Sequence, residues 1–268
     1  MQESFEWKKK LIDDYGLAFH VKDILIFEEK AEDKTHIIPF FADGYPGIMF
    51  QKTEKGVFLK PQNKFLSEIF LYGLTIIPIE LVVEGAYRFI IFQLHPVAAR
   101  ALLGIDPKEL NDDCYDLNLL SSVATKEYVG EIHKTDDIRA QSEIIALLIS
   151  QLILNKVYFP HATIMDAIEM IIKSAGKISV KELTEKLNIT ERTLQRNFIE
   201  HVGVPPKKFA KIIQFYSSFN QVTADSWSRL TDIVYENGFA DQSHFIRDFK
   251  KYTGQKPKEL KVKKEGKI

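Results

Sequence analysis

A pattern of helices and turns occurs twice, about fifty residues apart, in the last hundred positions of the chain. Such a repeat constrains the fold strongly, because each copy must form the same supersecondary unit. The offset is 50 in the first helices and 51 from the start of the second helices, so the second turn has one extra residue. The equivalent pairs are Thr190 and Asp241, Leu194 and Phe245, Arg196 and Arg247, Phe198 and Phe249, Gly203 and Gly254, and Pro206 and Pro257.

Each copy predicts two helices joined by a short turn. The first helix carries an apolar stripe, and the second begins at a capping side chain, keeps two residues inward and ends at a glycine. Two such copies predict tandem helix-turn-helix units; the alternative is a pair of helical hairpins that only pack on one another, as in a solenoid. The stripes are Val180, Leu183 and Leu187 in one copy and Leu230, Ile233 and Val234 in the other.

The side chains expected to face outward on the second helices favour DNA. Arginine can form two hydrogen bonds to guanine and glutamine two to adenine, at the width of the major groove. We therefore predict base contacts from Arg192, Gln195 and Arg196 in the first copy and from Gln242, Ser243 and Arg247 in the second. Phosphate contacts are predicted for the lysines that follow, namely Lys207, Lys208, Lys211, Lys250, Lys251 and Lys256.

Charge divides the chain in the same way. Residues 163–268 carry 19 basic and 13 acidic residues, a net charge of +6. The remaining 17 basic and 24 acidic residues give residues 1–162 a net charge of −7. An acidic half joined to a basic half indicates that one part meets a polyanion and the other does not.

At these residues the sequence resembles the AraC/XylS family of transcriptional regulators. The resemblance covers about residues 162–260 and is strongest in the run GFADQSHFIRDFKK at 238–251, followed by Gly254 and Pro257. It implies two units joined by a rigid helix at about 206–222, each placing its second helix in one of two successive major grooves. It also implies the base contacts named above, with RNA polymerase as a further partner.

Four positions depart from the family pattern. Thr184 and Val234 stand where the family usually has alanine for close helix packing, which puts the helix crossing angles in question. Gln214 replaces a frequent arginine in the linking helix, and Ile246 stands where a small or polar residue is common. An isoleucine there either favours a thymine methyl group or weakens base recognition.

The first half of the chain predicts a different architecture. Short β-rich runs at 24–27, 37–41, 47–51, 70–79 and 87–94 alternate with turn residues, which favours a small antiparallel sandwich or barrel. Helical segments follow at 97–103, 119–133 and 136–154, to cover the sheet or to pair with a second copy. We expect an α+β chain with a β-rich domain at 1–158 and an all-α DNA-binding domain at 159–268, joined near Pro160.

This first half resembles, less closely, the cupin-like sensor domains attached to regulators of this family. The resemblance is carried by the runs FFADG at 40–44 and FQLHPVAA at 92–99. It implies a pocket for a small-molecule effector or a surface for a homodimer. Eight aromatic side chains are expected either to line such a cavity or to form an ordinary core, namely Phe40, Phe41, Tyr45, Phe70, Tyr72, Tyr87, Phe89 and Phe92.

The alternative function is a metal-dependent cupin-like enzyme with a helical interaction tail. Its candidate ligands are His20, His36, His95, Glu80 and Glu84, but their spacing matches no common metal motif, so we expect neither a metal nor a cofactor. Cys114 is the single cysteine and is expected to be an inert thiol. Nucleotide-binding and hydrolase motifs are absent from the sequence, so the chain is not expected to be an enzyme.

Apolar runs are too short to cross a bilayer, and residues 1–10 lack the apolar block of a secretory signal. We therefore expect a cytoplasmic protein with no membrane partner.

Overall fold

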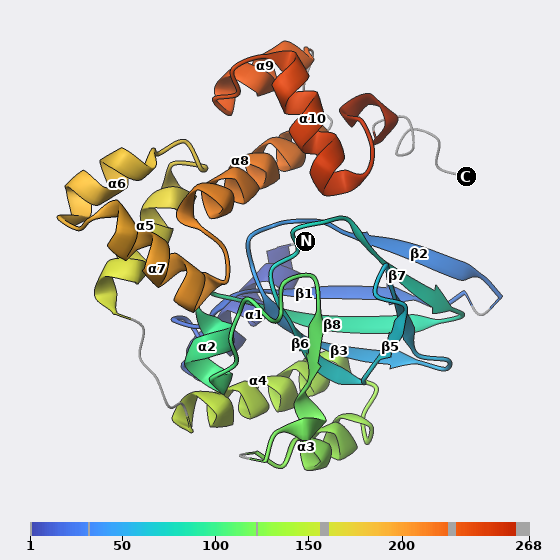
Figure 1. Cartoon of the computed structure of the whole chain (residues 1–268). Helices are drawn as coiled ribbons and strands as arrows, with labels where there is room; N and C mark the ends of the chain where they lie inside the picture. Colours follow the sequence, from blue (N-terminus) through green and yellow to red (C-terminus); the bar gives the residue numbers. More distant parts are fainter. Residues whose placement is uncertain (1, 32, 122, 156–160, 225–228, 261–268) are drawn as a thin grey trace.

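A computed structural model describes residues 2–31, 33–121, 123–155, 161–224 and 229–260. Its N-terminal domain contains two antiparallel sheets (Figure 1), with strand orders β1-β8-β3-β6-β9 and β2-β7-β4-β5. The strands are β1 (Val21–Glu29), β2 (Thr35–Phe40), β3 (Gly47–Thr53), β4 (Val57–Lys60), β5 (Lys64–Leu66), β6 (Ile69–Tyr72), β7 (Ile79–Glu84), β8 (Tyr87–Leu94) and β9 (Cys114–Asp116). The two-sheet sandwich and the α+β class predicted from the sequence are confirmed.

Strand β8 shows why the sequence there is continuously apolar. Phe89 and Ile91 point into the core between the two sheets, whereas Ile90 and Phe92 point to the other face. Because successive side chains of a strand alternate between faces, a strand covered on both sides must be apolar at every position. The five-stranded sheet is thus the middle of three layers.

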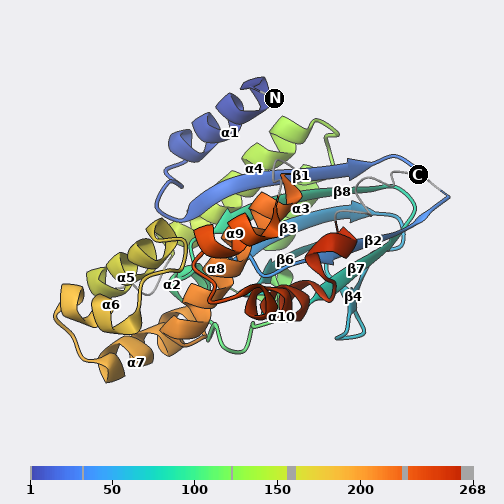
Figure 2. The same cartoon turned by 90° about the horizontal axis from the view of Figure 1, so that it is seen from above.

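Helices cover the outer face of that sheet. The main cover is α4 (Ile138–Leu154), whose Ile145, Leu148 and Leu152 belong to the same core as Ile90 and Phe92. The other helical elements of this domain are α1 (Gln2–Asp14), α2 (Ala98–Leu103), the 3-10 helix η1 (Leu117–Leu119) and α3 (Thr125–Ile132). Figure 2 shows α1 at the edge of the sheet beside β1.

The C-terminal domain is helical, as predicted. Its helices are α5 (Ala162–Lys173), α6 (Val180–Leu187), α7 (Glu191–Val202), α8 (Pro206–Thr223), α9 (Leu230–Glu236) and α10 (Gln242–Thr253). The pairs α6–α7 and α9–α10 form the first and second helix-turn-helix units, and α8 connects them (Figure 1). The predicted domain boundary after residue 158 lies outside the described residues.

Three predictions about secondary structure are wrong in detail. The run predicted as one strand at 70–79 contains β6, which ends at Tyr72, then residues 73–78 outside any strand and only the first residue of β7. The helix expected at 119–133 begins only at Thr125, after η1. Helix α1, strands β4, β5 and β9, and all of β7 after Ile79 were not predicted; α1 is polar, and β4, β5 and β9 are very short.

None of the helices in the described parts of the chain is long and apolar enough to span a bilayer.

Candidate DNA interface

Side chains fix where the second helix of each unit begins. The Thr190 hydroxyl accepts a hydrogen bond from the Thr193 N–H at 3.2 Å, and the Asp241 carboxylate accepts one from the His244 N–H at 2.7 Å. Both helices end at a glycine in the left-handed region, Gly203 at φ 82° and Gly254 at φ 73°. The predicted caps and ends of α7 and α10 are therefore confirmed.

A cap on the first unit was not predicted. Ser179 and Glu182 form a reciprocal capping box at the start of α6, in which the Glu182 carboxylate accepts from the Ser179 N–H at 2.9 Å. The signal was present in the sequence as a serine followed three residues later by a glutamate, just ahead of the apolar stripe.

Helices α7 and α10, which we call the reading helices, each have a buried and an exposed face. The predicted inward residues Leu194, Phe198, Phe245 and Phe249 are at most 1% exposed. The six side chains predicted to contact bases are all exposed, namely Arg192, Gln195, Arg196, Gln242, Ser243 and Arg247. The arrangement can present guanidinium and amide groups to an external partner.

The predicted phosphate-contacting lysines differ in their surroundings. Lys207, Lys250 and Lys251 are exposed. Lys208 is half-buried, and burial together with the Lys251 ammonium lowers its pKa, whereas Asp112 of the N-terminal domain opposes this shift. Lys211 lies 3.9 Å from the Asp248 carboxylate. The start of α8 and the C-terminal end of α10 thus bring positively charged side chains together.

Gln214, one of the departures from the family pattern, connects α8 to the second unit. Its amide donates to the Asn237 carbonyl at 2.8 Å, where α9 ends. The buried Asn237 amide in turn donates to the Ile233 carbonyl at 2.8 Å and to the Gln221 side chain at 2.6 Å. This buried polar network was missed from the sequence, because it joins residues of separate helices.

The other departures are accommodated within the helices. The Thr184 hydroxyl donates to the Lys181 carbonyl at 2.8 Å, and Val234 is buried in the core of the second unit. Ile246 is half-buried and packs against that core.

The N-terminal domain meets α8 through the loop that follows β2. Phe41 lies against Phe219 with ring centroids 5.0 Å apart, and a side chain at Gly44 would lie 2.5 Å from Ile213. Between them, the Asp43 carboxylate accepts hydrogen bonds from the Tyr45 N–H and the Gln93 amide. The loop FFADG is therefore part of the contact between the two domains.

Buried charge is concentrated at this loop. Burial raises the pKa of Asp43 to about 6, although the Tyr45 N–H, the Lys22 ammonium and the Gln93 amide favour its ionised form. The Lys22 ammonium lies 3.5 Å from the centre of the Tyr45 ring and 5.4 Å from that of Tyr216 on α8.

The space between the two sheets is nearly filled. Phe40, Phe70 and Tyr72 line a void of about 20 Å³, which has room for about one water. The aromatic residues predicted to line a cavity or a core thus mainly form a core, and Phe41 contacts α8 instead.

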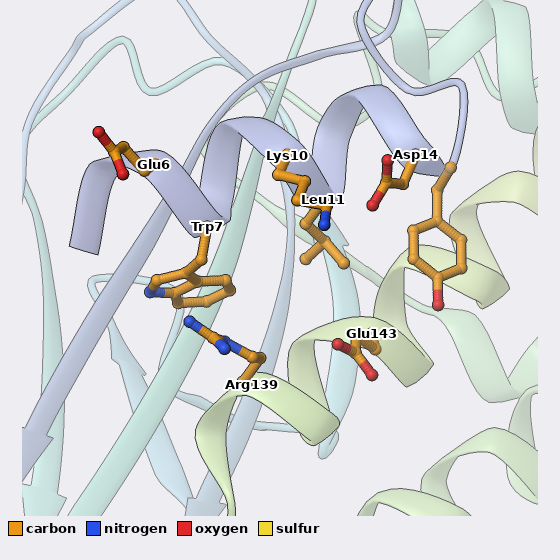
Figure 3. A pocket seen from close by; sticks show the side chains of 8 residues that line it. Glu6, Trp7, Lys10, Leu11, Asp14, Arg139 and Glu143 are labelled. Carbon is orange, nitrogen blue, oxygen red and sulfur yellow. The ribbon is translucent and has the colours of Figure 1, made fainter. Parts of the chain in front are cut away.

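A much wider groove lies between α1 and α4, with a volume of about 1090 Å³. Figure 3 shows Trp7 and Arg139 facing each other across it, and the guanidinium carbon lies 5.5 Å from the Trp7 ring centre. Acidic and basic side chains alternate along its walls, and both helices belong to the layer that covers the sheet.

The candidate metal ligands of the alternative function do not gather at one site, although the His95 N–H donates to the His20 carbonyl at 2.8 Å. His36 stacks edge-on against Tyr87, and Glu84 forms an ion pair with Lys55 at 2.8 Å. Within the described ranges, no three histidine, cysteine or carboxylate side chains converge on a point that could hold a metal ion. Burial raises the pKa of Cys114 to about 12, so its thiolate is strongly disfavoured near neutral pH.

Two family models match the chain. Residues 183–262 match a helix-turn-helix domain, and residues 14–116 match a domain of unknown function. The transcriptional activator RhaS of Escherichia coli is 24% identical over 92 residues, which are 34% of this chain and 33% of RhaS. An HTH-type transcriptional regulator of Staphylococcus aureus is 31% identical over 84 residues, which are 31% of this chain and 11% of that protein. This chain thus covers a third or less of these relatives.

The fold is similar to that of ToxT from Vibrio cholerae. One ToxT structure aligns with a TM-score of 0.52 at 14% identity, covering 89% of this chain and 97% of ToxT. Another, with an unsaturated fatty acid bound, aligns with a TM-score of 0.50 at 17% identity over 90% and 94% of the two chains. The likeness extends over both domains.

Proposed function

Because the chain belongs to the AraC/XylS family of transcriptional regulators, we propose that it binds a specific DNA sequence with both helix-turn-helix units at once. In this proposal α7 and α10 enter successive major grooves on one side of the duplex. The centres of the two half-sites then lie about 34 Å apart, one turn of the double helix.

The observation that carries this proposal is the exposure of equivalent polar side chains on both reading helices. Arg196 and Arg247 occupy the same position of the repeat, and both are exposed while the residues two positions away from them are buried. An arginine at such a position can donate two hydrogen bonds to guanine. Arg192 and Gln195 in the first unit, and Gln242 and Ser243 in the second, complete the proposed base contacts.

Phosphate contacts supply most of the non-specific part of the affinity in this proposal. Lys207, Lys208, Lys250 and Lys251 are its candidates, near the C-terminal end of α10 and the start of α8. Each phosphate that they neutralise releases counterions, so we expect the affinity to fall steeply with salt concentration.

The test is a selection of bound fragments from the genomic DNA of the host. We expect the wild-type chain to enrich a motif with two half-sites about one helical turn apart. The test variant carries both Arg196→Ala and Arg247→Ala. Its control carries Lys55→Ala and Lys64→Ala on the N-terminal domain, so that both variants lose two positive charges. Enrichment of no motif by the wild-type chain contradicts the proposal, as does the same motif from the double arginine variant.

The finer part of the proposal is that the N-terminal domain adjusts DNA binding through a small-molecule effector or a second copy of the chain. Its support is the direct contact of that domain with α8, together with the ligand-bound structures of ToxT, one of which holds an unsaturated fatty acid. RNA polymerase is the partner that such a regulator would affect, and the cytoplasm is where we expect it to act. Measuring DNA affinity and molecular mass together across protein concentrations separates self-association from an effector.

A further inference from the structure

Loops of the N-terminal domain lie beside both reading helices at equivalent positions of the repeat. Gly203 ends α7, and a side chain there would lie 2.7 Å from the Pro107 carbonyl carbon. Gly254 ends α10, and a side chain there would lie 3.9 Å from the Pro78 ring. Pro107 and Pro78 both belong to loops of the N-terminal domain. The same domain therefore approaches both reading helices at their C-terminal ends, and its Ala42 belongs to the core of the second unit.

The contact at the first unit is polar as well as close. The Asn111 amide donates to the Gly203 carbonyl at 3.0 Å, and the Arg100 guanidinium on α2 lies 3.2 Å from the Glu200 carboxylate on α7. The carbonyl at this position lacks a partner within the helix, so an external donor satisfies it. Figure 1 shows α2 directly beside the end of α7.

Asp112 joins the two loops that make these contacts. Its carboxylate accepts hydrogen bonds from the Ile76 and Ile77 N–H groups, the latter at 3.0 Å, and its own N–H donates to the Leu74 carbonyl at 2.9 Å. Its backbone is in the left-handed region at φ 59°, which aspartate and asparagine tolerate better than most side chains. The loop that holds Gly203 and the loop beside Gly254 are thus connected by one residue.

A connected path therefore runs from α7 through Asn111 and Asp112 to Pro78, which lies beside the end of α10. Helix α8 already joins the two units on another side. A single connection permits bending and twisting about itself, whereas a second connection at a distance from the first restricts both. The separation of the reading helices is consequently set by the N-terminal domain as well as by α8.

We propose that Asn111 and Asp112 are positioning residues that make the full chain discriminate between DNA sites by the number of base pairs between their two halves. This inference rests on the proposed function, because it needs both units to bind DNA. Adding one base pair moves the half-sites about 3.4 Å apart and rotates them by about a tenth of a turn. A rigidly held pair of helices cannot follow that change, whereas a loosely held pair can.

The experiment measures the affinity of the full chain for the duplex selected by the wild-type protein and for the same duplex with one or two base pairs inserted between the halves. We expect the wild-type chain to lose at least about tenfold in affinity with one added base pair, which is the size of effect that the loss of a good base contact produces. Asn111→Ala and Asp112→Ala should lose less than about threefold, since their units can move apart.

Two controls separate positioning from general damage. Asp112→Asn keeps both the left-handed backbone and an acceptor oxygen, so it should restore the wild-type dependence on spacing. Lys55→Ala removes an exposed ion pair with Glu84 in the same domain and should leave that dependence unchanged. A third variant is a further test and not a control: Arg100→Ala, which breaks the ion pair with Glu200, should weaken the dependence on spacing as Asn111→Ala does.

An equal spacing penalty in wild type, Asn111→Ala and Asp112→Ala, with all three chains folded by circular dichroism, overturns the inference. A wild-type chain that binds its selected duplex equally well at every spacing also overturns it. The proposed function fails separately, when the wild-type chain prefers no sequence over random DNA.

Discussion

The two helix-turn-helix units share a pattern but differ in how they are attached to the rest of the molecule. The first unit has a core that continues into the N-terminal domain, which contributes Leu74, Ile76 and Val97. The core of the second unit includes Ala42 from that domain. Charge differs too, since Glu200 near the end of α7 corresponds to Lys251 near the end of α10. A repeat in the sequence therefore produces one unit that is more firmly anchored and one whose reading helix is more cationic.

We expect the largest effect from substitutions that create a cavity in the core of one unit or the other. Phe198 and Phe249 are equivalent in the repeat and both are fully buried, so replacing either with alanine should cost about 3 to 5 kcal/mol. Calorimetry should show a single transition shifted to lower temperature for Phe198→Ala, because its core includes the N-terminal domain. Phe249→Ala should instead separate an early transition of the second unit. Identical melting profiles would mean that the units are equally attached.

The repeat also predicts equal roles for two arginines despite the unequal attachment. Arg196→Ala and Arg247→Ala should each weaken binding to the selected duplex by about 1 to 3 kcal/mol and relax base preference at one position. Fluorescence anisotropy on the selected duplex and on random DNA measures both effects. An equal loss on the two kinds of DNA would indicate that the arginine contacts only phosphate.

How much of this could be predicted from the sequence depends on the distance over which each interaction acts. The caps Thr190 and Asp241 act within three residues, so their chemistry is visible locally and both predictions are confirmed. The hydrogen bond from Asn111 to Gly203 joins residues 92 positions apart, and no local pattern announces it.

Glycine illustrates the same limit. The sequence predicts Gly203 as a helix end, and its positive φ confirms this, but the close approach of Pro107 is a second reason for glycine at that position. Strand β6 ends at Tyr72, so the strand predicted at 70–79 is wrong, and the Leu110 backbone occupies the space of a side chain at the next residue, Gly73. The six base contacts remain predictions, since exposure permits them without testing them.

A third prediction concerns pH and the loop between the sheets and α8. The pKa of Asp43 is about 6 in the folded chain and about 4 in the unfolded chain. Folding therefore favours the protonated form of this carboxyl group. Stability from this group is therefore fully present below about pH 4 and is lost as the pH rises through about 6, by roughly 1 to 3 kcal/mol. The groups that face it are Lys22, Tyr45, Tyr72, Gln93 and Tyr216.

Asp43→Asn keeps the shape of the side chain and removes its charge. Urea unfolding between pH 4 and 7 measures the free energy of unfolding, which should fall with rising pH in the wild type and should lack this fall in Asp43→Asn. The control Glu84→Gln changes an exposed carboxylate and should keep the wild-type pH dependence. Because Asp43 accepts hydrogen bonds from Tyr45 and Gln93 within the N-terminal domain, the effect should fall mainly on the transition that includes that domain. A variant with the wild-type pH profile would exclude Asp43 as its source.

The smallest expected effect separates the charges at the ends of the two reading helices. Lys251 is exposed, whereas its equivalent in the repeat, Glu200, is paired with Arg100 at 3.2 Å. Replacing Lys251 with alanine should lower the slope of log affinity against log salt by about one, because one phosphate contact and its released counterion are lost. Glu200→Gln should leave the slope unchanged, since that side chain contacts the N-terminal domain. A lower slope for Glu200→Gln, or an unchanged slope for Lys251→Ala, would show that the phosphate contacts do not follow the difference in charge between the two reading helices. It would also show that α7 carries more of the non-specific binding than its charge indicates.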